Sequence, residues 1–117
     1  LTKALENTTI QFRFGSDEID PRSEPLIEKL AGIIKGCAGQ LLIAGHTDNV
    51  GTAERNQRLS LRRANSVKRA LYARGIATTR MRSAGYGERQ PIAPNTSEQG
   101  RAKNRRITIQ LDPTATP

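Results

Sequence analysis

The sequence of 117 residues has few aromatic residues and no long apolar run. It contains no tryptophan, two tyrosines and two phenylalanines, so we expect a core of aliphatic side chains. The longest uncharged apolar run, 41–44, is far too short to cross a bilayer, which takes about 20 residues. No signal-peptide pattern opens the chain, which begins at Leu1 and has its only methionine at Met81. We therefore expect a piece of a longer protein whose targeting signal and membrane anchor lie outside these residues.

The residues that most often build catalytic or metal centres are also scarce. The only cysteine, Cys37, has no partner within the sequence, which leaves its pairing open. The only histidine, His46, lacks the further histidines or cysteines that a zinc site needs. Residues 85–87 (G-Y-G) lack the third glycine of a dinucleotide fingerprint, and no phosphate-binding loop or catalytic triad signature is present. We therefore expect neither an enzyme, nor a cofactor, nor a metal.

Acidic residues are few in the second half of the chain, and the net charge is +8. Residues 1–51 contain 5 Lys or Arg and 7 Asp or Glu, whereas residues 52–117 contain 14 and 4. Such a basic half indicates either an anionic partner or no more than a soluble surface. The four aromatic residues are not interleaved with basic ones, so nucleic-acid binding remains only a distant alternative.

Hydrophobic patterning predicts one α/β domain over residues 1–117, with its core at about 9–111 and a frayed tail at 112–117. We expect a mixed sheet of about four strands with helices packed on one face. Ser23 and Thr52 are the expected caps of the two helices. Residues 85–100 are expected to form a long loop. The expected strands are 9–14, 40–46 (central and covered on both faces), 80–84 and 105–111, and the expected helices end near Lys35 and Arg74.

Two polar residues fall on the apolar side of the second helix. With Leu59 set at 0° and about 100° per residue, Arg63 lies near 40° and Asn56 near 60°, inside the arc of core residues. A buried guanidinium is unfavourable without a partner, so Arg63 should meet a carboxylate, carbonyl groups or a ligand. The alternatives are that Arg63 extends to solvent or pairs internally and that Asn56 only bonds the local backbone.

Asp48 follows the expected central strand, at the kind of strand end where ligands bind in open α/β sheets. Together with Arg63 it could bind a zwitterion, with Asp48 on an ammonium and Arg63 on a carboxylate. If the two side chains touch instead, they form a plain ion pair and the site closes. The sequence leaves both arrangements open, and Asp48 or Thr47 could also simply shape the loop.

Several motifs in one order resemble the OmpA-like peptidoglycan-binding domain family. Residues 45–71 read G-H-T-D-N-V-G-T-A-E-R-N-Q-R-L-S-L-R-R-A-N-S-V-K-R-A-L, residues 85–95 read G-Y-G-E-R-Q-P-I-A-P-N, and residues 100–107 read G-R-A-K-N-R-R-I. The segment F-R-F-G-S-D-E-I-D-P at 12–21 resembles the opening strand and loop of the family. The resemblance extends from about Thr9 to Leu111.

The resemblance implies a β-α-β-α-β sandwich that binds the peptide stem of peptidoglycan at diaminopimelate. It assigns Asp48 to the free ammonium of diaminopimelate and Arg63 to its carboxylate. Gly15 to Asp17 fall in the first ligand loop, and Asn104 falls at the rim of the pocket. The ligand-binding residues expected on these grounds are Asp48, Arg63, Asn56, Thr47, Leu59 and Arg105.

The expected function is therefore non-covalent attachment of an envelope protein to the cell wall. The partner is peptidoglycan, with no nucleic acid, and a membrane is reached only through an anchor outside this sequence. We expect a periplasmic location, at the outer membrane rather than the inner one, and leave open whether the domain forms a homodimer. The main alternative is a stator or secretion-machine module of the same fold whose wall binding is regulated or lost.

Overall fold

The computed structural model describes residues 10–13 and 15–111. In chain order the elements are η1 (Pro21–Ser23), α2 (Glu24–Lys35), β1 (Leu41–His46), α3 (Ala53–Ala73), η2 (Thr78–Arg80), β2 (Met81–Gly87), α4 (Glu98–Asn104) and β3 (Arg106–Leu111), where η marks a short 3-10 helix. None of the described helices is long and apolar enough to span a membrane.

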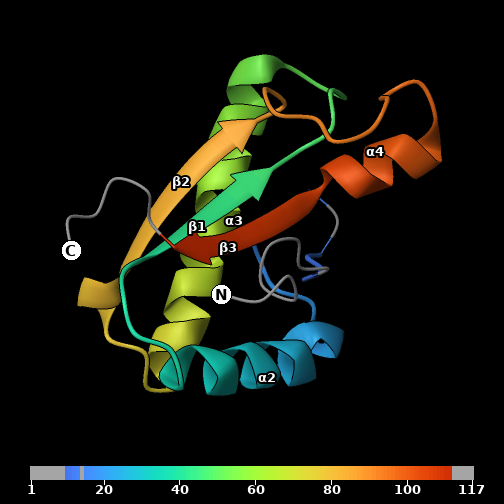
Figure 1. Cartoon of the computed structure of the whole chain (residues 1–117). Coiled ribbons are helices and arrows are strands. Elements are labelled where there is room, and N and C mark those ends of the chain that lie inside the picture. The colour runs from blue at the N-terminus through green and yellow to red at the C-terminus, as the bar shows by residue number, and fades with distance from the viewer. Residues whose placement is uncertain (1–9, 14, 112–117) are drawn as a thin grey trace.

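The sheet is mixed and has the strand order β2-β1-β3 (Figure 1). β1 pairs in parallel with β2 and antiparallel with β3, and each of its six residues is buried. The predicted mixed sheet with residues 41–46 at its centre is thus confirmed. The described residues contribute three strands to it, where about four were expected.

The missing strand is the one predicted at residues 9–14. Thr9 and Phe14 lie outside the described residues, and those between them make only an isolated antiparallel bridge from Phe12 to Ile19. Ile10 is nevertheless buried, and Phe12 packs against the core. The apolar alternation therefore correctly predicted that Ile10 and Phe12 face the core. The described residues of this segment nevertheless do not join the sheet.

Ser23 also differs from its predicted role. It occupies the position before α2, but its hydroxyl makes no capping hydrogen bond there. Instead, Ser23 Oγ accepts a hydrogen bond of 2.8 Å from the backbone N–H of Gln11. The side chain therefore fastens the N-terminal segment to the start of α2.

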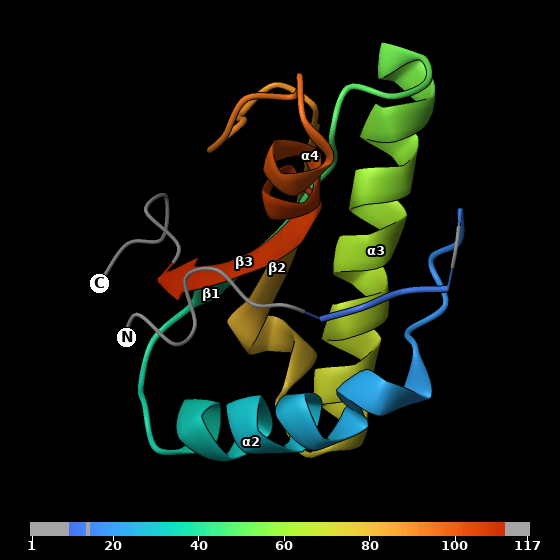
Figure 2. The same cartoon turned by 90° about the vertical axis from the view of Figure 1, so that its right-hand side faces the viewer.

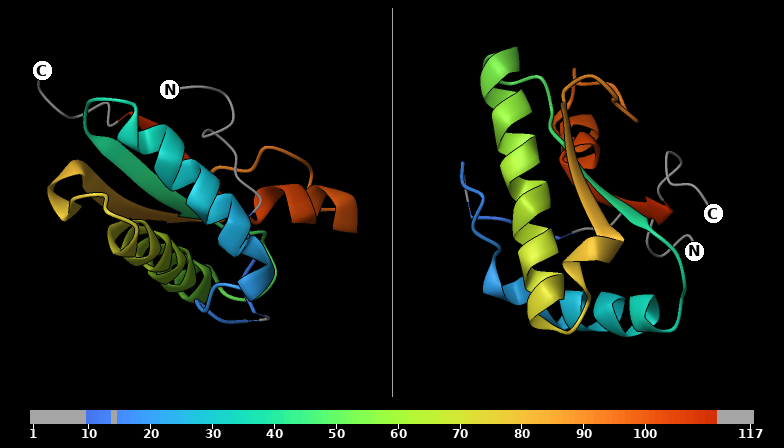
Figure 3. Two further views of the ribbon diagram at one scale, coloured as in Figure 1. Left: turned by 90° about the horizontal axis from the view of Figure 1, so that it is seen from below. Right: turned by 90° about the vertical axis from the view of Figure 1, so that its left-hand side faces the viewer.

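The longest helix, α3, covers one face of the sheet, and α2 crosses the end of this layer (Figures 2 and 3). Thr52 caps α3 as predicted, because its Oγ1 accepts from the Arg55 N–H at 3.1 Å. The helices and strands enclose one aliphatic core, as the paucity of aromatic residues predicted. Its members are Ile10, Ile27, Leu30, Ala31, Ile34, Leu41, Ile43, Ala64, Val67, Leu71, Ile76, Met81, Ile107 and Ile109.

Two adjacent glycines allow α3 to approach the sheet closely. Gly45 of β1 and Gly85 of β2 are register partners. Gly45 faces the backbone of Ser60 in α3, and Gly85 faces the backbone of Leu61 and the Ser60 hydroxyl. A Cβ atom at Gly45 would lie 2.0 Å from Ser60 O, so no larger residue fits without moving the helix. Ser60 Oγ in turn accepts from the Gly87 N–H at 2.9 Å. These contacts set the position of α3 against the carboxyl ends of β1 and β2.

α4 begins within the loop that was predicted at residues 85–100 and continues to Asn104. Ser97 caps this helix by accepting from the Gly100 N–H at 3.0 Å. A Cβ atom at Gly100 would lie 1.7 Å from Pro94 O, so the glycine is required by the close passage of the preceding loop. Because glycine inside a helix is usually unfavourable, Gly100 argues against a helix when the sequence is considered alone.

Candidate ligand-binding site

The predicted acid lies just beyond the carboxyl end of β1, beside the start of β3. The antiparallel register that pairs His46 with Arg106 brings Asp48 next to Arg105. Arg105 Nη1 donates to Asp48 Oδ2 at 2.8 Å, and the Val50 N–H donates to Asp48 Oδ1 at 3.0 Å. Asp48 is only 8% exposed, yet each carboxylate oxygen has one described partner and can accept another hydrogen bond.

Thr47 and Asn56 hold the backbone of the loop that carries Asp48. Thr47 Oγ1 donates to Asp48 O at 2.8 Å, and Asn56 Nδ2 donates to Asp48 O at 3.3 Å and to Val50 O at 3.0 Å. The Thr47 N–H also donates to Gly87 O at 2.8 Å, which ties the loop to β2. Both side chains are buried, so in this structure they shape the loop from beneath.

The side chain of Arg63, on α3, contacts the segment that precedes α2. This segment runs beside α3 in Figure 2. Arg63 Nε donates to Ser16 O at 2.8 Å, and its guanidinium carbon lies 4.9 Å from the centre of the Phe12 ring. The sequence predicted that this half-buried cation would need a partner, and the structure provides a carbonyl group and an aromatic face. Within the described part of the chain, Arg63 Nη1 and Nη2 make no hydrogen bond.

The charges around Arg63 form one electrostatic cluster. Burial lowers the pKa of Arg63, because it removes water from the guanidinium, and the positive charge of Arg105 lowers it further. The negative charges of Asp17 and Asp48 raise it in opposition. Among the described residues, Asp48 is paired with Arg105 and makes no ion pair with Arg63. The alternative in which Asp48 and Arg63 close the site by touching is therefore not the observed arrangement.

Arg105 connects Asp48 to an acid that the sequence analysis did not identify. Its Nη2 donates to Glu98 Oε1 at 2.6 Å, so each of its terminal nitrogens holds one carboxylate. The pKa of Arg105 is raised, first by the hydrogen bond with Glu98 and next by the one with Asp48. Glu98 was missed because α4 was missed. The only signal available was the Ser97 cap one residue earlier.

The remaining predicted residues, Leu59 and Asn104, are both buried. Leu59 is 8% exposed on the inner side of α3. Asn104, expected at the rim, is fully buried, and this prediction was wrong. Its Oδ1 accepts from the N–H groups of Ile92 and Ala93, and its Nδ2 donates to Ala93 O and to Asn95 Oδ1. Asn104 therefore organises the loop before α4 and is not available at the surface.

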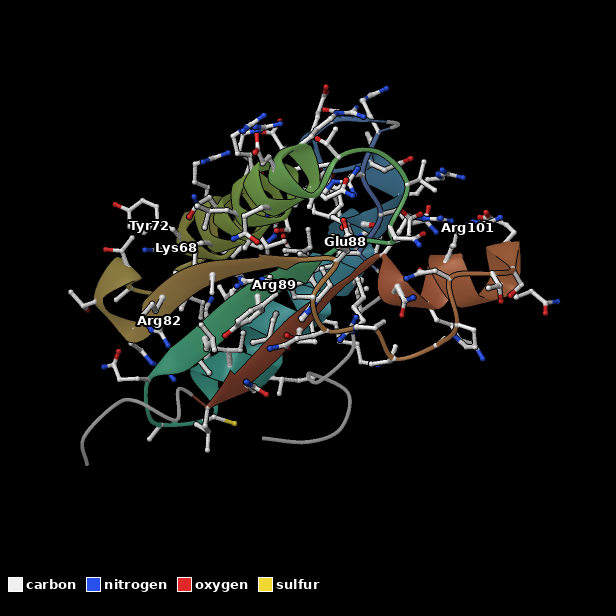
Figure 4. All side chains as sticks on the ribbon, turned by 90° about the horizontal axis from the view of Figure 1, so that it is seen from above. Lys68, Tyr72, Arg82, Glu88, Arg89 and Arg101 are labelled. Carbon is white, nitrogen blue, oxygen red and sulfur yellow. The ribbon has the colours of Figure 1, made fainter. Side chains whose placement is uncertain are left out.

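The described surface also has a hollow of about 540 Å³ that includes none of the predicted site residues. Figure 4 labels Glu88 and Arg89, which line it on the β2 side. It is completed from α3 by Ala53, Glu54, Gln57 and Arg58. No group of three or more His, Cys, Asp or Glu side chains in the described ranges could hold a metal ion.

A mixed sheet covered by α3, with an acid and two arginines at the carboxyl end of its central strand, defines a small α/β domain of the OmpA-like class. The model of the OmpA family matches residues 11–105. The chain belongs to the OmpA family. This family consists of structural and anchoring proteins, and membership in it confirms the prediction that the domain is not an enzyme.

Several curated relatives are named as proteins of the bacterial outer membrane or as peptidoglycan-associated. The outer membrane porin F of Pseudomonas fluorescens is 38% identical over 104 residues, which cover 88% of this chain and 32% of the porin. The peptidoglycan-associated lipoprotein of Pseudomonas aeruginosa is 33% identical over 88% of this chain and 61% of its own length. The chain therefore spans between about a third and three fifths of these relatives.

Solved structures confirm the fold class. The peptidoglycan-associated lipoprotein from Burkholderia pseudomallei superposes with a TM-score of 0.79 at 31% identity, covering 91% of this chain and 89% of that one. The periplasmic domain of Helicobacter pylori MotB gives 0.78 at 28% identity, with coverages of 86% and 68%. The cell wall anchor of the T6SS from Pseudomonas aeruginosa gives 0.76 at 33% identity, with coverages of 84% and 71%.

Proposed function

We propose that this domain binds peptidoglycan non-covalently, by gripping the diaminopimelate of the stem peptide at its free ammonium and carboxylate. The observation that carries this proposal is the state of Arg63. Its cation is half-buried and held in place through Nε, while its two terminal nitrogens have no partner among the described residues. Two parallel N–H donors at the end of a fixed guanidinium match the two oxygens of a carboxylate.

Asp48 supplies the second half of the recognition. Its carboxylate is fixed by Val50 and by Arg105 and lies close enough to Arg63 to influence the pKa of that group. Each Asp48 oxygen can accept a further hydrogen bond, so a ligand ammonium can join without breaking these contacts. A ligand with an ammonium and a carboxylate on one carbon, as at the free end of diaminopimelate, would satisfy both residues.

The other predicted residues support this pair. Thr47 and Asn56 keep Asp48 in place through the loop backbone, and Leu59 supports α3 from the inner side. Arg105 contacts Asp48 directly and borders the ammonium position. Of the six residues, we assign direct polar contact to Asp48, Arg63 and Arg105 and a supporting role to the rest.

Binding at one site is expected to be weak. Two charge-assisted contacts in a partly solvated site contribute about 3–6 kcal/mol before the cost of ordering the peptide is subtracted. The dissociation constant should therefore lie between about 1 μM and 1 mM. Firm attachment then depends on many copies acting on one polymeric wall.

This function places the domain in the periplasm as the wall-binding part of an envelope protein, at the outer membrane rather than the inner one. A stator or secretion-machine module is the second candidate. It is favoured by the likeness to the periplasmic domain of MotB and to the T6SS wall anchor. An inner-membrane helix elsewhere in the protein would support the second candidate, and a lipidated cysteine or an outer-membrane barrel the first.

Sedimentation with purified cell walls tests the proposal. The wild-type chain should pellet with the walls, and free diaminopimelate should release it. Asp48→Asn and Arg63→Gln should each weaken binding at least tenfold, because each leaves a charged end of the ligand without its partner. The matched control is Arg69→Gln, which removes the same charge from an exposed position of α3 that bonds only Ser66 among the described residues.

Unfolding curves of all four proteins show whether the variants are folded. If folded Asp48→Asn and Arg63→Gln pellet as the wild type does, the assignment of these residues is wrong. If walls containing lysine in place of diaminopimelate bind equally well, the carboxylate contact of Arg63 is wrong.

A further inference from the structure

Three charged side chains from separate elements form a chain that ends in the proposed site. Glu98 is in the first turn of α4, Arg105 follows this helix, and Asp48 follows β1. Arg105 donates to Glu98 Oε1 at 2.6 Å and to Asp48 Oδ2 at 2.8 Å. Its side chain is 39% exposed, that of Glu98 67% and that of Asp48 11%, so the chain runs from solvent into the site.

The contact between Arg105 and Glu98 affects how Arg105 pairs with Asp48. A guanidinium with no other partner tends to bind a carboxylate through two parallel hydrogen bonds. Arg105 makes only one to Asp48, through Nη1, while its Nη2 donates to Glu98 and the second oxygen of Asp48 accepts from the Val50 N–H. The contact with Glu98 therefore competes with two-point pairing between Arg105 and Asp48.

The same contact sets the local charge. Two carboxylates share the guanidinium of Arg105, so Glu98 offsets part of its positive charge beside Asp48. Without the charge of Glu98, Asp48 alone would oppose the charge of Arg105. An incoming ammonium would then be attracted to this group less strongly.

Glu98 is itself held in a defined position. Its Oε2 accepts from Arg101 Nε at 3.3 Å, and Arg101 Nη1 donates to Asn95 O at 3.0 Å. Figure 4 shows Arg101 on α4. The hydrogen bond with Arg105 is the main cause that lowers the pKa of Glu98, so Glu98 stays ionised over a wider range of pH.

We propose that Glu98 is a positioning residue that makes the site selective for a ligand ammonium, by drawing Arg105 away from full pairing with Asp48. This inference rests on the proposed function and adds a residue to it. Glu98 acts through Arg105 and does not contact the ligand. Its effect should therefore depend on whether the ligand carries an ammonium, whereas a purely structural effect would not.

The test measures binding of three synthetic stem tripeptides, L-Ala-γ-D-Glu-X amide, to the 117-residue chain by calorimetry at low salt. X is diaminopimelate, 2-aminopimelate (which lacks the distal ammonium) or lysine (which lacks the distal carboxylate). Glu98→Gln should weaken binding of the diaminopimelate peptide about two- to fivefold, a modest effect because the ion pair is partly exposed. Binding of the 2-aminopimelate peptide should stay the same or improve. The lysine peptide should weaken like the diaminopimelate peptide.

Two further variants make the result interpretable. Glu98→Asp keeps the charge in the first turn of α4 and should retain most of the preference for an ammonium. Glu28→Gln removes a similarly exposed acid that pairs with Arg74, and it should change none of the three affinities. Equal weakening of all three peptides by Glu98→Gln, or no weakening of any, would overturn the inference.

Failure of the inference can be told apart from failure of the proposed function. If Asp48→Asn and Arg63→Gln abolish binding while Glu98→Gln matches the wild type, only the role of Glu98 is wrong. If none of the three substitutions changes binding of the diaminopimelate peptide, the proposed site itself is wrong.

Discussion

Replacement of Gly45 by alanine should separate α3 from the sheet and destabilise the domain severely. The added Cβ would lie 2.0 Å from Ser60 O and 2.8 Å from the carbonyl carbon of Ser60. Both atoms belong to the helix backbone, so no side-chain rotation relieves the overlap. Since carbon atoms in contact lie about 3.5–4.0 Å apart, α3 must move outward by about 1 Å or more.

The free-energy cost follows from what this movement disrupts. Leu59, Ala64 and Val67 are buried on the inner side of α3, and a gap of 0.5–1 Å forfeits about a quarter to a half of each contact energy. Overpacking usually costs about 1–3 kcal/mol, and the upper end applies here because backbone meets backbone. We expect a loss of about 3 kcal/mol, which is a large part of the 5–15 kcal/mol typical of a domain.

Urea and thermal unfolding measure this effect, and a drop in the melting temperature of about 10–20 °C is expected for a domain of this size. Gly32→Ala is the matched control. Gly32 lies inside α2 with no atom within 4 Å of an added Cβ, so alanine should stabilise the helix by about 0.5–1 kcal/mol. If Gly45→Ala unfolds within about 0.5 kcal/mol of the wild type, the close approach of α3 to the sheet is not what the structure describes.

The imidazole of His46 and the amide of Asn104 provide two further predictions. Burial, and to a smaller extent the charge of Arg106, lower the pKa of His46 from 6.5 to about 4. The unfolded chain therefore takes up the proton first, and stability should fall by about 1–3 kcal/mol between pH 6.5 and 4. His46→Gln should flatten this part of a stability–pH profile measured by urea unfolding, and an unchanged profile would contradict the assignment. Asn104→Ala leaves several buried polar groups of the preceding loop without partners and should cost about 2–4 kcal/mol. Limited proteolysis should then cleave between residues 88 and 97 faster than in the wild type, and equal cleavage rates would argue against the role of Asn104.

The parts of the fold that sequence reasoning predicted are those governed by one strong local signal. Residues 41–44 form a continuous apolar run, and such a run is typical of a strand covered on both faces, as β1 is, since all six of its residues are buried. α3 was predicted from its apolar periodicity and the Thr52 cap, which both lie within the helix or next to it. α4 was missed because the fit of Gly100 depends on Pro94, a contact that no local pattern reports.

In the site, too, the sequence predicted what depends on a local pattern and not what depends on tertiary contacts. Helix phase alone placed Arg63 on the inner side of α3 and required a partner for its cation, and the structure provides Ser16 O and the Phe12 ring. The identity of those partners depends on how the N-terminal segment crosses α3, which a periodic pattern does not encode. The pairing of Asp48 with Arg105 follows from the register of β1 and β3, so it too became visible only in three dimensions.

The electrostatic environment of Arg63 indicates whether this arginine stabilises the fold or binds a ligand. The lowered pKa of Arg63 means that the fold disfavours its charged form, because burial and the charge of Arg105 together outweigh the attraction of Asp17 and Asp48. Removing a cation of this kind should not cost folding free energy beyond the loss of the Ser16 hydrogen bond and the Phe12 contact. An arginine that contributes little to stability, and whose two terminal nitrogens have no partner among the described residues, is better suited to a ligand than to the core. For the same reason, Arg63→Gln should lose wall binding while its unfolding curve stays close to that of the wild type, which makes a loss of binding attributable to the missing guanidinium.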